Sequence, residues 1–271
     1  MKSLRFFFPL VSLILVPLGD AWAQGDDTAR LVHAWGRFGE GSWKRVRVTN
    51  ESLDSLGNIV TTVTETTTTL TELGEDGYTL RVEVIVDVAG QQVTTKPKLI
   101  TRGFNGELEG QTVSVRKIGT RDFRVDDRTI PCELQQIVID RGDSKLTTSV
   151  HVAKNTMPYV LRRTTVTTDP AGMTTRLESN AEVVEVERPY RLFGRSVPTA
   201  TIKTVQNTPH GNTVTEEVFS DEIPGGVVSH VSTQTDPEGV VIRRSTLELL
   251  DYHAVPGSPP RRRLFGRRRG R

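Results

Sequence analysis

The sequence predicts an all-β protein built on one large, curved antiparallel sheet, either an open barrel or a half-barrel. Three observations point to this fold: a body rich in threonine and valine, segments in which apolar and polar residues alternate, and a turn motif that recurs within an internal repeat. We expect about eleven or twelve strands, with two packed sheets as the alternative arrangement. One short helix is expected near the N-terminus, over residues 28–38.

The threonine-rich tract at residues 61–71 predicts a long strand. Its sequence, TTVTETTTTLT, contains no proline or serine and is flanked by regular strand patterns. β-Branched side chains lose rotamer freedom in helices and pack well on a pleated surface. A glycosylated stalk or a low-complexity linker is the alternative for such a tract. We expect a strand with one face in solvent.

A second strand pattern follows at residues 81–88. Charged residues alternate there with four valines, which are Val82, Val84, Val86 and Val88. This period of two is typical of a strand with one buried face. Together with Leu247 and Leu249, these valines form an apolar sheet face and are the candidate residues for contact with an apolar ligand.

The turn sequence Thr-Asp-Pro-x-Gly occurs at residues 168–172 and again 67 residues later. Proline fixes φ, aspartate can bond to its own backbone and glycine accepts positive φ, so each copy predicts a hairpin turn. The flanks also match in type, which indicates repeats at about 129–190 and 199–253 and a degenerate copy at about 43–90. Each repeat is a four-strand meander, and several must curl together to form a core.

The first 23 residues predict a cleaved signal peptide. Lys2 and Arg5 precede an apolar stretch from Phe6 to Leu18, and Ala21-Trp22-Ala23 fits an A-x-A cleavage site. An uncleaved anchor is the alternative, but the apolar stretch is short for a span of about 20 residues. We expect a mature chain that begins at Gln24 and is exported to the periplasm or the extracellular space.

Charge is distributed unevenly between the body, residues 24–254, and the tail, residues 255–271. The formal net charge is +2, but the tail holds seven arginines and no acidic residue, so the body is negative. Guanidinium groups bind phosphate and carboxylate in a forked geometry. The candidate anion-binding residues are Arg261, Arg262, Arg263, Arg267, Arg268 and Arg269.

Two interpretations of this tail remain open. It can tether the protein to an anionic envelope surface, with Leu264 and Phe265 inserting at a membrane. Alternatively, it is a solvated, disordered end. Because Arg-Leu-Phe-Gly-Arg also occurs at residues 191–195, after the first repeat, part of the tail can be a remnant of the repeat.

The sequence predicts no catalytic residue, no metal site and no cofactor. The single cysteine, Cys132, lies in a strand-like context and is expected to be a small buried hydrophobe. The five histidines are dispersed without metal-ligand spacing. Neither a nucleophile-elbow nor a P-loop motif occurs, and no feature predicts a specific nucleic-acid partner.

These features resemble exported bacterial half-barrel proteins of the Lol-type periplasmic lipoprotein-carrier fold. The shared features are the signal, the short N-terminal helix, the threonine- and valine-rich strands and the Asp-Pro-x-Gly hairpins. The resemblance covers the β body and implies a lipid or lipoprotein ligand. Those carriers have additional helices that line a hydrophobic cavity, and this sequence offers no candidate for them beyond residues 28–38. No binding residue is carried over.

The sequence thus predicts an exported, non-enzymatic protein of the cell envelope. In the first hypothesis it binds a lipid or another apolar ligand on a concave sheet. In the alternative it is a structural or interaction protein, tethered to anionic surfaces through its arginine-rich tail.

Overall fold

The computed structural model describes residues 30, 32–54, 56–88 and 90–257 of the chain. The predicted signal peptide and the six candidate arginines of the tail lie outside these residues. The strands are β1 (Trp43–Leu53), β2 (Ile59–Leu73), β3 (Gly77–Val88), β4 (Gln91–Thr94), β5 (Lys98–Gly103), β6 (Thr112–Val125), β7 (Arg128–Asp140), β8 (Lys145–Val152), β9 (Val160–Thr168), β10 (Thr175–Leu192), β11 (Arg195–Thr208), β12 (Gly211–Phe219), β13 (Val227–Thr235) and β14 (Val241–His253).

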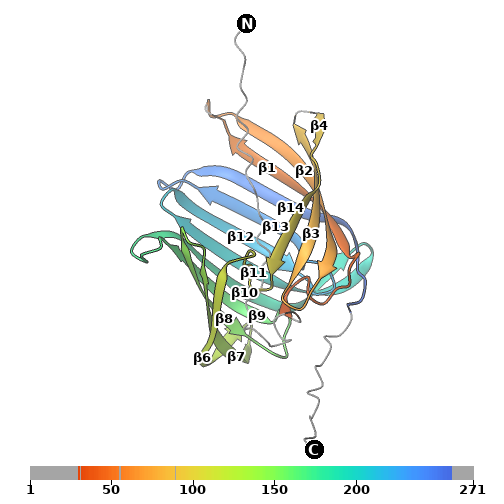
Figure 1. Ribbon diagram of the computed structural model, residues 1–271. Helices are drawn as coiled ribbons and strands as arrows, with labels where there is room; N and C mark the ends of the chain where they lie inside the picture. Colours follow the sequence, from red (N-terminus) through yellow and green to blue (C-terminus); the bar gives the residue numbers. More distant parts are fainter. Residues whose placement is uncertain (1–29, 31, 55, 89, 258–271) are drawn as a thin grey trace, which may run out of the picture.

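All the described strands belong to one antiparallel sheet, in the order β4-β3-β2-β1-β14-β13-β12-β11-β10-β9-β8-β7-β6, with β5 also paired to β3. Neighbours in the sheet are neighbours in sequence, except that β14 lies beside β1 and β5 pairs with β3. Strand β6 forms one edge and β4 and β5 form the other, and these described edges are not paired with each other. The sheet is therefore an open, strongly curved trough (Figure 1). The predicted curved antiparallel sheet is confirmed, with 14 strands in place of the smaller number expected.

Local irregularities in the long strands accompany this curvature. The register of β10 against β11 shifts twice, between Val183 and Glu185 and between Glu185 and Arg188. Within this stretch Glu187 has a positive φ of 56°. An extra residue in one strand of a pair bends the strand and increases its twist. The sheet thereby curls far enough for β6 and β10 to contact each other.

The two Asp-Pro-x-Gly turns have nearly the same hydrogen bonds, as their repetition predicts. Gly172 N donates to Asp169 O at 3.0 Å, and Gly239 N donates to Asp236 O at 3.1 Å. Each aspartate also accepts a bond at its Oδ1 from a backbone N–H four residues later, at 2.9 and 2.8 Å. The turns connect β9 to β10 and β13 to β14, so the repeated sequence forms equivalent hairpins.

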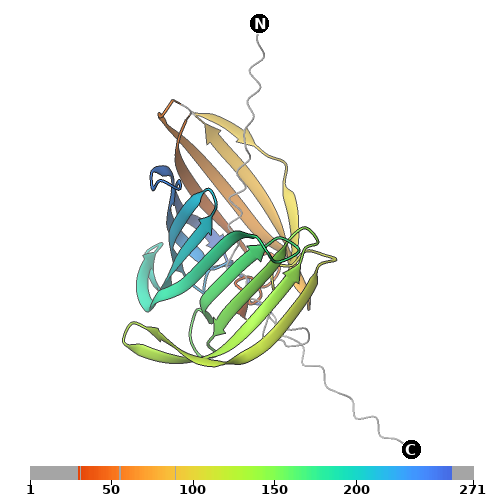
Figure 2. The same ribbon diagram turned by 90° about the vertical axis from the view of Figure 1, so that its left-hand side faces the viewer.

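Buried apolar side chains form three clusters. The first joins Leu80 of β3 to Ile137 of β7, from opposite ends of the sheet, through Trp35 of the N-terminal segment. The second packs Phe123 of the β6–β7 hairpin against Ile202 of β11. The third joins β1, β13 and β14 to the β10–β11 hairpin. Figure 2 shows the sheet wrapping around this interior from a second direction.

The N-terminal segment departs from the predicted helix over residues 28–38. Helical geometry is described only at Arg30 and Val32, and turns follow from Ala34 to Arg37. The chain bends here because Gly36 packs against the backbone of Arg30 so closely that a Cβ atom would overlap it. No helix in the described part of the chain is long and apolar enough to cross a membrane.

The C-terminal residues Val255–Gly257 belong to the body and not to the tail. Phe38 pairs with Pro256 in an isolated bridge. Gly39 N donates to Val255 O at 2.7 Å, and Gly257 N donates to Arg37 O at 3.1 Å. The described body therefore extends to residue 257, three residues beyond the expected boundary at 254.

Candidate functional site

One transverse row of side chains crosses eight strands on a single face of the sheet. From β10 to β3 the row consists of Val183, Ile202, Glu217, His230, Leu247, Val48, Thr64 and Val86. Residues directly opposite each other on neighbouring strands project from the same face. Because Val183, Ile202, Leu247 and Val48 belong to the buried clusters, the row faces the interior of the trough. Glu217 and His230 are thus placed in the middle of an aliphatic row.

The next two rows on this face are polar. The first contains Thr204, Thr215, Ser232, Ser245, Asn50 and Thr62. The second contains Gln206, Thr213, Gln234, Arg243 and Ser52. Cross-strand bonds join some of them: Thr215 donates to Ser232 at 2.9 Å, and Arg243 donates to Asn50 at 2.7 Å. The concave face therefore changes from apolar to polar along the strands.

Several polar groups at this boundary are buried without a partner. His230 is 4% exposed, and neither of its ring nitrogens has a hydrogen bond. Ser245 is 3% exposed, and its hydroxyl also has no hydrogen bond. Glu217 is 9% exposed. Most buried polar groups in folded proteins have partners, so His230 and Ser245 are unusual. Together with the buried Glu217, which lies opposite His230, they are the candidate site.

Lys44 of β1 supplies a positive charge near this set. It is half-buried, and its Nζ donates to the carbonyl oxygen of Gly225 at 3.3 Å, in the loop between β12 and β13. Burial lowers the pKa of Lys44 to about 8, and the nearby Glu217 opposes this shift. Trp35 lies under the same loop, because a Cβ atom on Gly225 would lie 2.8 Å from its indole ring.

Glu217 and His230 lie opposite each other, and the pKa of each is shifted in the direction that favours its neutral form. Burial raises the pKa of the Glu217 carboxyl to about 7, and Lys44 acts in the opposite direction. Burial lowers the pKa of His230 to about 4, and the charge of Lys44 adds to this shift. Near neutral pH the site therefore offers a neutral imidazole, a carboxyl group close to its midpoint and an ammonium group. Within the described part of the chain, no group of three potential ligands can hold a metal ion.

The residues proposed from the sequence lie partly on the same face. Val82, Val84 and Val86 are half-buried, and Val82 packs against the first core cluster. Val88 ends β3, and its side chain lies outside the described set. Leu247 and Leu249 are buried in the third cluster and are core residues. Cys132 is buried in the second cluster, as expected, and burial raises its thiol pKa to about 11.

Sequence reasoning missed Glu217, His230 and Lys44. The adjacent acids Glu216 and Glu217 in an alternating strand were a usable signal, because one of two neighbours in a strand must point inward. Glu216 is exposed and Glu217 is buried. Which histidine lies opposite Glu217 depends on the pairing of β12 with β13, and that register is a property of the folded sheet.

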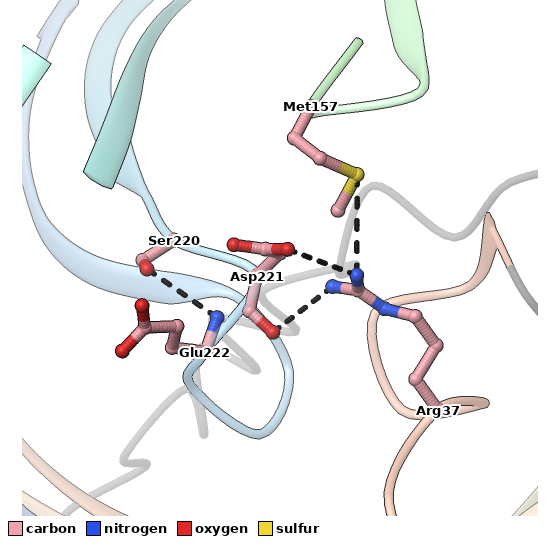
Figure 3. Close-up of polar contacts among 5 residues, drawn as sticks. All are labelled: Arg37, Met157, Ser220, Asp221 and Glu222. Atoms are coloured by element: carbon pink, nitrogen blue, oxygen red, sulfur yellow. Dashed lines mark hydrogen bonds and ion pairs between the residues drawn. The ribbon is translucent and has the colours of Figure 1, made fainter. Parts of the chain in front are cut away.

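A second polar arrangement fixes the N-terminal segment to two loops (Figure 3). Arg37 Nη1 donates to Asp221 Oδ2 at 3.0 Å, and its Nη2 donates to the Asp221 carbonyl oxygen at 2.9 Å. The same guanidinium contacts Met157 Sδ at 3.9 Å and lies over the Tyr159 ring. A cavity of about 20 Å³ beside Arg37 is large enough for one water molecule only. This arrangement is a structural clamp.

No family model matches the chain, and no curated protein matches it. Similar solved structures include a LolA superfamily protein from Nitrosomonas europaea, with 10% identity, a TM-score of 0.31 and coverage of 86% of this chain and 94% of that one. A DUF1329 family protein from Desulfovibrio piger has 9% identity and a TM-score of 0.33, covering 79% of this chain and 85% of that one. A protein with a YmcC-like fold from Bacteroides fragilis has 9% identity and a TM-score of 0.31, covering 79% and 97%. At this level of similarity, these structures say nothing of the ligand or activity of this chain.

Proposed function

We propose that this protein is an exported, non-enzymatic binding protein of the cell envelope, which holds an amphipathic ligand of the lipid class on the concave face of its sheet. The observation that carries the proposal is the change from apolar to polar side chains along that face. Val48 and Leu247 lie in the row that also holds Glu217 and His230, and the rows beyond consist of hydroxyl and amide side chains and the guanidinium of Arg243. A ligand with one apolar and one polar part matches such a surface.

The open form of the sheet supports a ligand that lies in the trough. The edge strands are not paired with each other in the described chain, so the sheet does not close into a barrel. The cavity beside Arg37, of about 20 Å³, is too small for a lipid. Val84, Val86 and Thr64 on this face are half-buried, so part of their surface stays in contact with solvent. Export is supported by the predicted signal peptide at residues 1–23.

An acid–base enzyme is the competing function, because clusters of groups with shifted pKa values occur at active sites. The cluster here contains Glu217, His230 and Lys44. His230 forms no hydrogen bond, so no described partner orients it as a general base. Glycoside hydrolysis ordinarily needs two carboxyl groups flanking the bond, and Glu217 is the one carboxyl group in this cluster. Binding therefore accounts for the cluster better than catalysis does.

Native mass spectrometry of the full chain, expressed in an exporting host, tests the proposal. We expect a discrete added mass of lipid size, which also identifies the ligand class. The variant Val84→Asp should reduce the bound fraction at least tenfold, because it places a charge on the concave face. Ile85→Asp is the matched control, because Ile85 is its neighbour on the outer face and is 39% exposed. A bare mass in the wild type, together with no binding of added amphiphiles, would contradict the proposal.

The alternative role, a tether through the arginine-rich tail, concerns residues outside the described chain. It is compatible with ligand binding, since the tail follows Gly257 and the concave face belongs to the body. Its test is a vesicle-binding measurement, given in the Discussion.

A further inference from the structure

Buried polar groups without partners make the site around Glu217 and His230 energetically costly to the folded protein. A buried donor or acceptor that loses its partner costs about 1–3 kcal/mol. His230 and Ser245 both carry such groups, on adjacent strands and on the same face. Aliphatic neighbours of similar size would remove this cost, as Ile202 and Leu247 do on either side of the pair. The polar residues therefore suit an occupied state of the site.

The titratable groups closest to Glu217 and His230 come from three strands, and Arg243 of β14 lies two rows further along the same face, where it donates to Asn50. Glu217 lies on β12, His230 on β13 and Lys44 on β1. Lys44 is anchored to the Gly225 carbonyl oxygen and acts on both other groups through space. One carboxylate and one ammonium leave the site with little net charge. An ion would upset this balance, whereas a neutral group that both donates and accepts hydrogen bonds would not.

We propose that Glu217, His230 and Ser245 form a recognition site for a neutral, hydroxyl-bearing group, the polyol or sugar part of the ligand. A hydroxyl can donate to the carboxylate while it accepts from the imidazole N–H or from the serine. Glu217 and His230 lie side by side on neighbouring strands, about 5 Å apart at their Cβ atoms, and the next inward row of hydroxyls lies about 7 Å further along the strands. A ring or chain with several hydroxyls can span the two rows.

The environment of the site favours a neutral group over a charged one. Burial displaces the pKa of Glu217 upward and the pKa of His230 downward, which means that the site disfavours charge of either sign. A phosphate or a quaternary ammonium would have to lose most of its hydration there. This inference rests on the proposed function, because it names the polar part of the same amphipathic ligand. It adds which residues contact the polar part of the ligand and which chemical groups they select.

The test compares head groups on one chain length. Isothermal titration calorimetry of the full-length protein would use decyl maltoside, decyl sulfate and decyltrimethylammonium below their micelle concentrations, and free maltose. We expect decyl maltoside to bind at least tenfold more tightly than the two charged amphiphiles. Equal affinity for all three head groups would overturn the recognition site while leaving the proposed function standing. No binding of any probe would overturn both.

Free maltose distinguishes between the two possible sources of the hydroxyl-bearing group, a glycolipid and a free saccharide. If the site serves a glycolipid, decyl maltoside should bind at least tenfold more tightly than maltose, because the decyl chain covers apolar surface. If maltose binds as tightly as decyl maltoside, the recognition site is supported, but its ligand is a free saccharide and the lipid part of the proposed function is overturned. Release of glucose from either probe would overturn the non-enzymatic assignment.

Variants assign the selectivity to the named residues. Glu217→Leu and Ser245→Ala should each lower the affinity for decyl maltoside at least tenfold. Ser245→Ala should leave the affinity for decyl sulfate unchanged, whereas Glu217→Leu should raise it, because the Lys44 ammonium is then no longer balanced. Glu216→Leu, the exposed neighbour on the outer face of β12, is the matched control and should change neither. Thermal unfolding supplies the second readout: removing the Ser245 hydroxyl, which is buried without a hydrogen-bond partner, should leave Tm unchanged or raise it. If Glu217→Leu fails to fold, Glu217→Gln and Ser245→Ala carry the test. Unchanged maltoside affinity in both would overturn the assignment.

Discussion

Glu217 of β12 and His230 of β13 lie directly opposite each other on the buried face of the sheet, and no hydrogen bond joins them. Their neighbours in the same row, Ile202 and Leu247, are aliphatic. Opposed side chains on this face are close enough to interact, but neither ring nitrogen of His230 has a hydrogen bond. The pair thus places unused hydrogen-bonding capacity in the middle of an apolar row.

Replacing Glu217 should change how stability depends on pH. The pKa of its carboxyl is raised from 4.5 to about 7 in the folded protein. The folded state therefore binds more protons than the unfolded state between these values, and the contribution of Glu217 to stability falls as pH rises from about 4.5 to 7. Glu217→Gln removes this loss, so its stability relative to the wild type should increase by on the order of 2–3 kcal/mol over that window.

Urea unfolding of both proteins at pH 4.5, 6 and 7.5 measures this difference. Glu216→Gln is the control, because Glu216 is exposed on the outer face of the same strand, and it should show no such trend. His230 works in the opposite direction, since its pKa is lowered to about 4 and its contribution is lost as pH falls below 6.5. The comparison with the wild type cancels that effect. A difference that stays constant with pH would contradict the prediction.

Gly226 should be far less tolerant of alanine than Gly239, although both have positive φ, 73° and 85°. A Cβ atom on Gly226 would overlap the ring of Phe219, whereas a Cβ atom on Gly239 would meet nothing within 4 Å. The left-handed backbone costs each alanine about 1–2 kcal/mol, and the overlap adds about 1–3 kcal/mol at Gly226 alone. Denaturant unfolding of the two variants should show this difference, and equal losses would argue against the tight packing of the loop.

The clamp between Arg37 and Asp221 should stabilise the fold more than the surface ion pairs do. Both side chains are partly buried, at 23% and 27% exposure. Asp221→Asn should lower the free energy of unfolding by about 1–2 kcal/mol, because a charge-assisted bond to a fixed guanidinium is lost. Glu83→Gln, which breaks the more exposed pair with Arg81, is the control and should cost less than about 0.5 kcal/mol. Similar losses in the two variants would mean that the clamp is an ordinary surface pair.

Deleting residues 258–271 should abolish salt-sensitive binding to anionic vesicles. Each arginine near an anionic surface contributes about 1 kcal/mol, and salt screens the attraction. The deletion begins at 258 because Val255–Gly257 pair with the N-terminal segment, and removing them would disturb the body. Co-sedimentation with phosphatidylglycerol vesicles at low and high salt measures the effect, and phosphatidylcholine vesicles are the control. Unchanged binding by the shortened chain would refute the tether.

The sequence predicted much of the fold because its signals are local. The threonine tract at residues 61–71 lies within β2, and the alternating valines lie in β3. The two Asp-Pro-x-Gly motifs form hairpin turns with matching bonds. The helix over residues 28–38 was not predicted well, because the turn at Gly36 depends on a close approach to Arg30 that no local pattern encodes.

The candidate site could not be predicted from the sequence because it depends on the pairing register of the strands. Lys44, Glu217 and His230 are far apart in the chain, and each resembles an ordinary strand residue. Moving one strand by a single residue would send Glu217 to the solvent face and Glu216 inward. The buried neighbours that shift the pKa values of these groups are likewise brought together only by folding.

The sequence by itself determined that the chain forms long antiparallel hairpins, because β-branched alternation and turn chemistry act between residues close in the chain. Tertiary structure alone decided that β14 pairs with β1, that the two ends of the sheet share one core around Trp35, and that Glu217 lies opposite His230. These relationships join residues that are distant in sequence. Their free energy comes from the burial of surfaces that exist only once the sheet has curled.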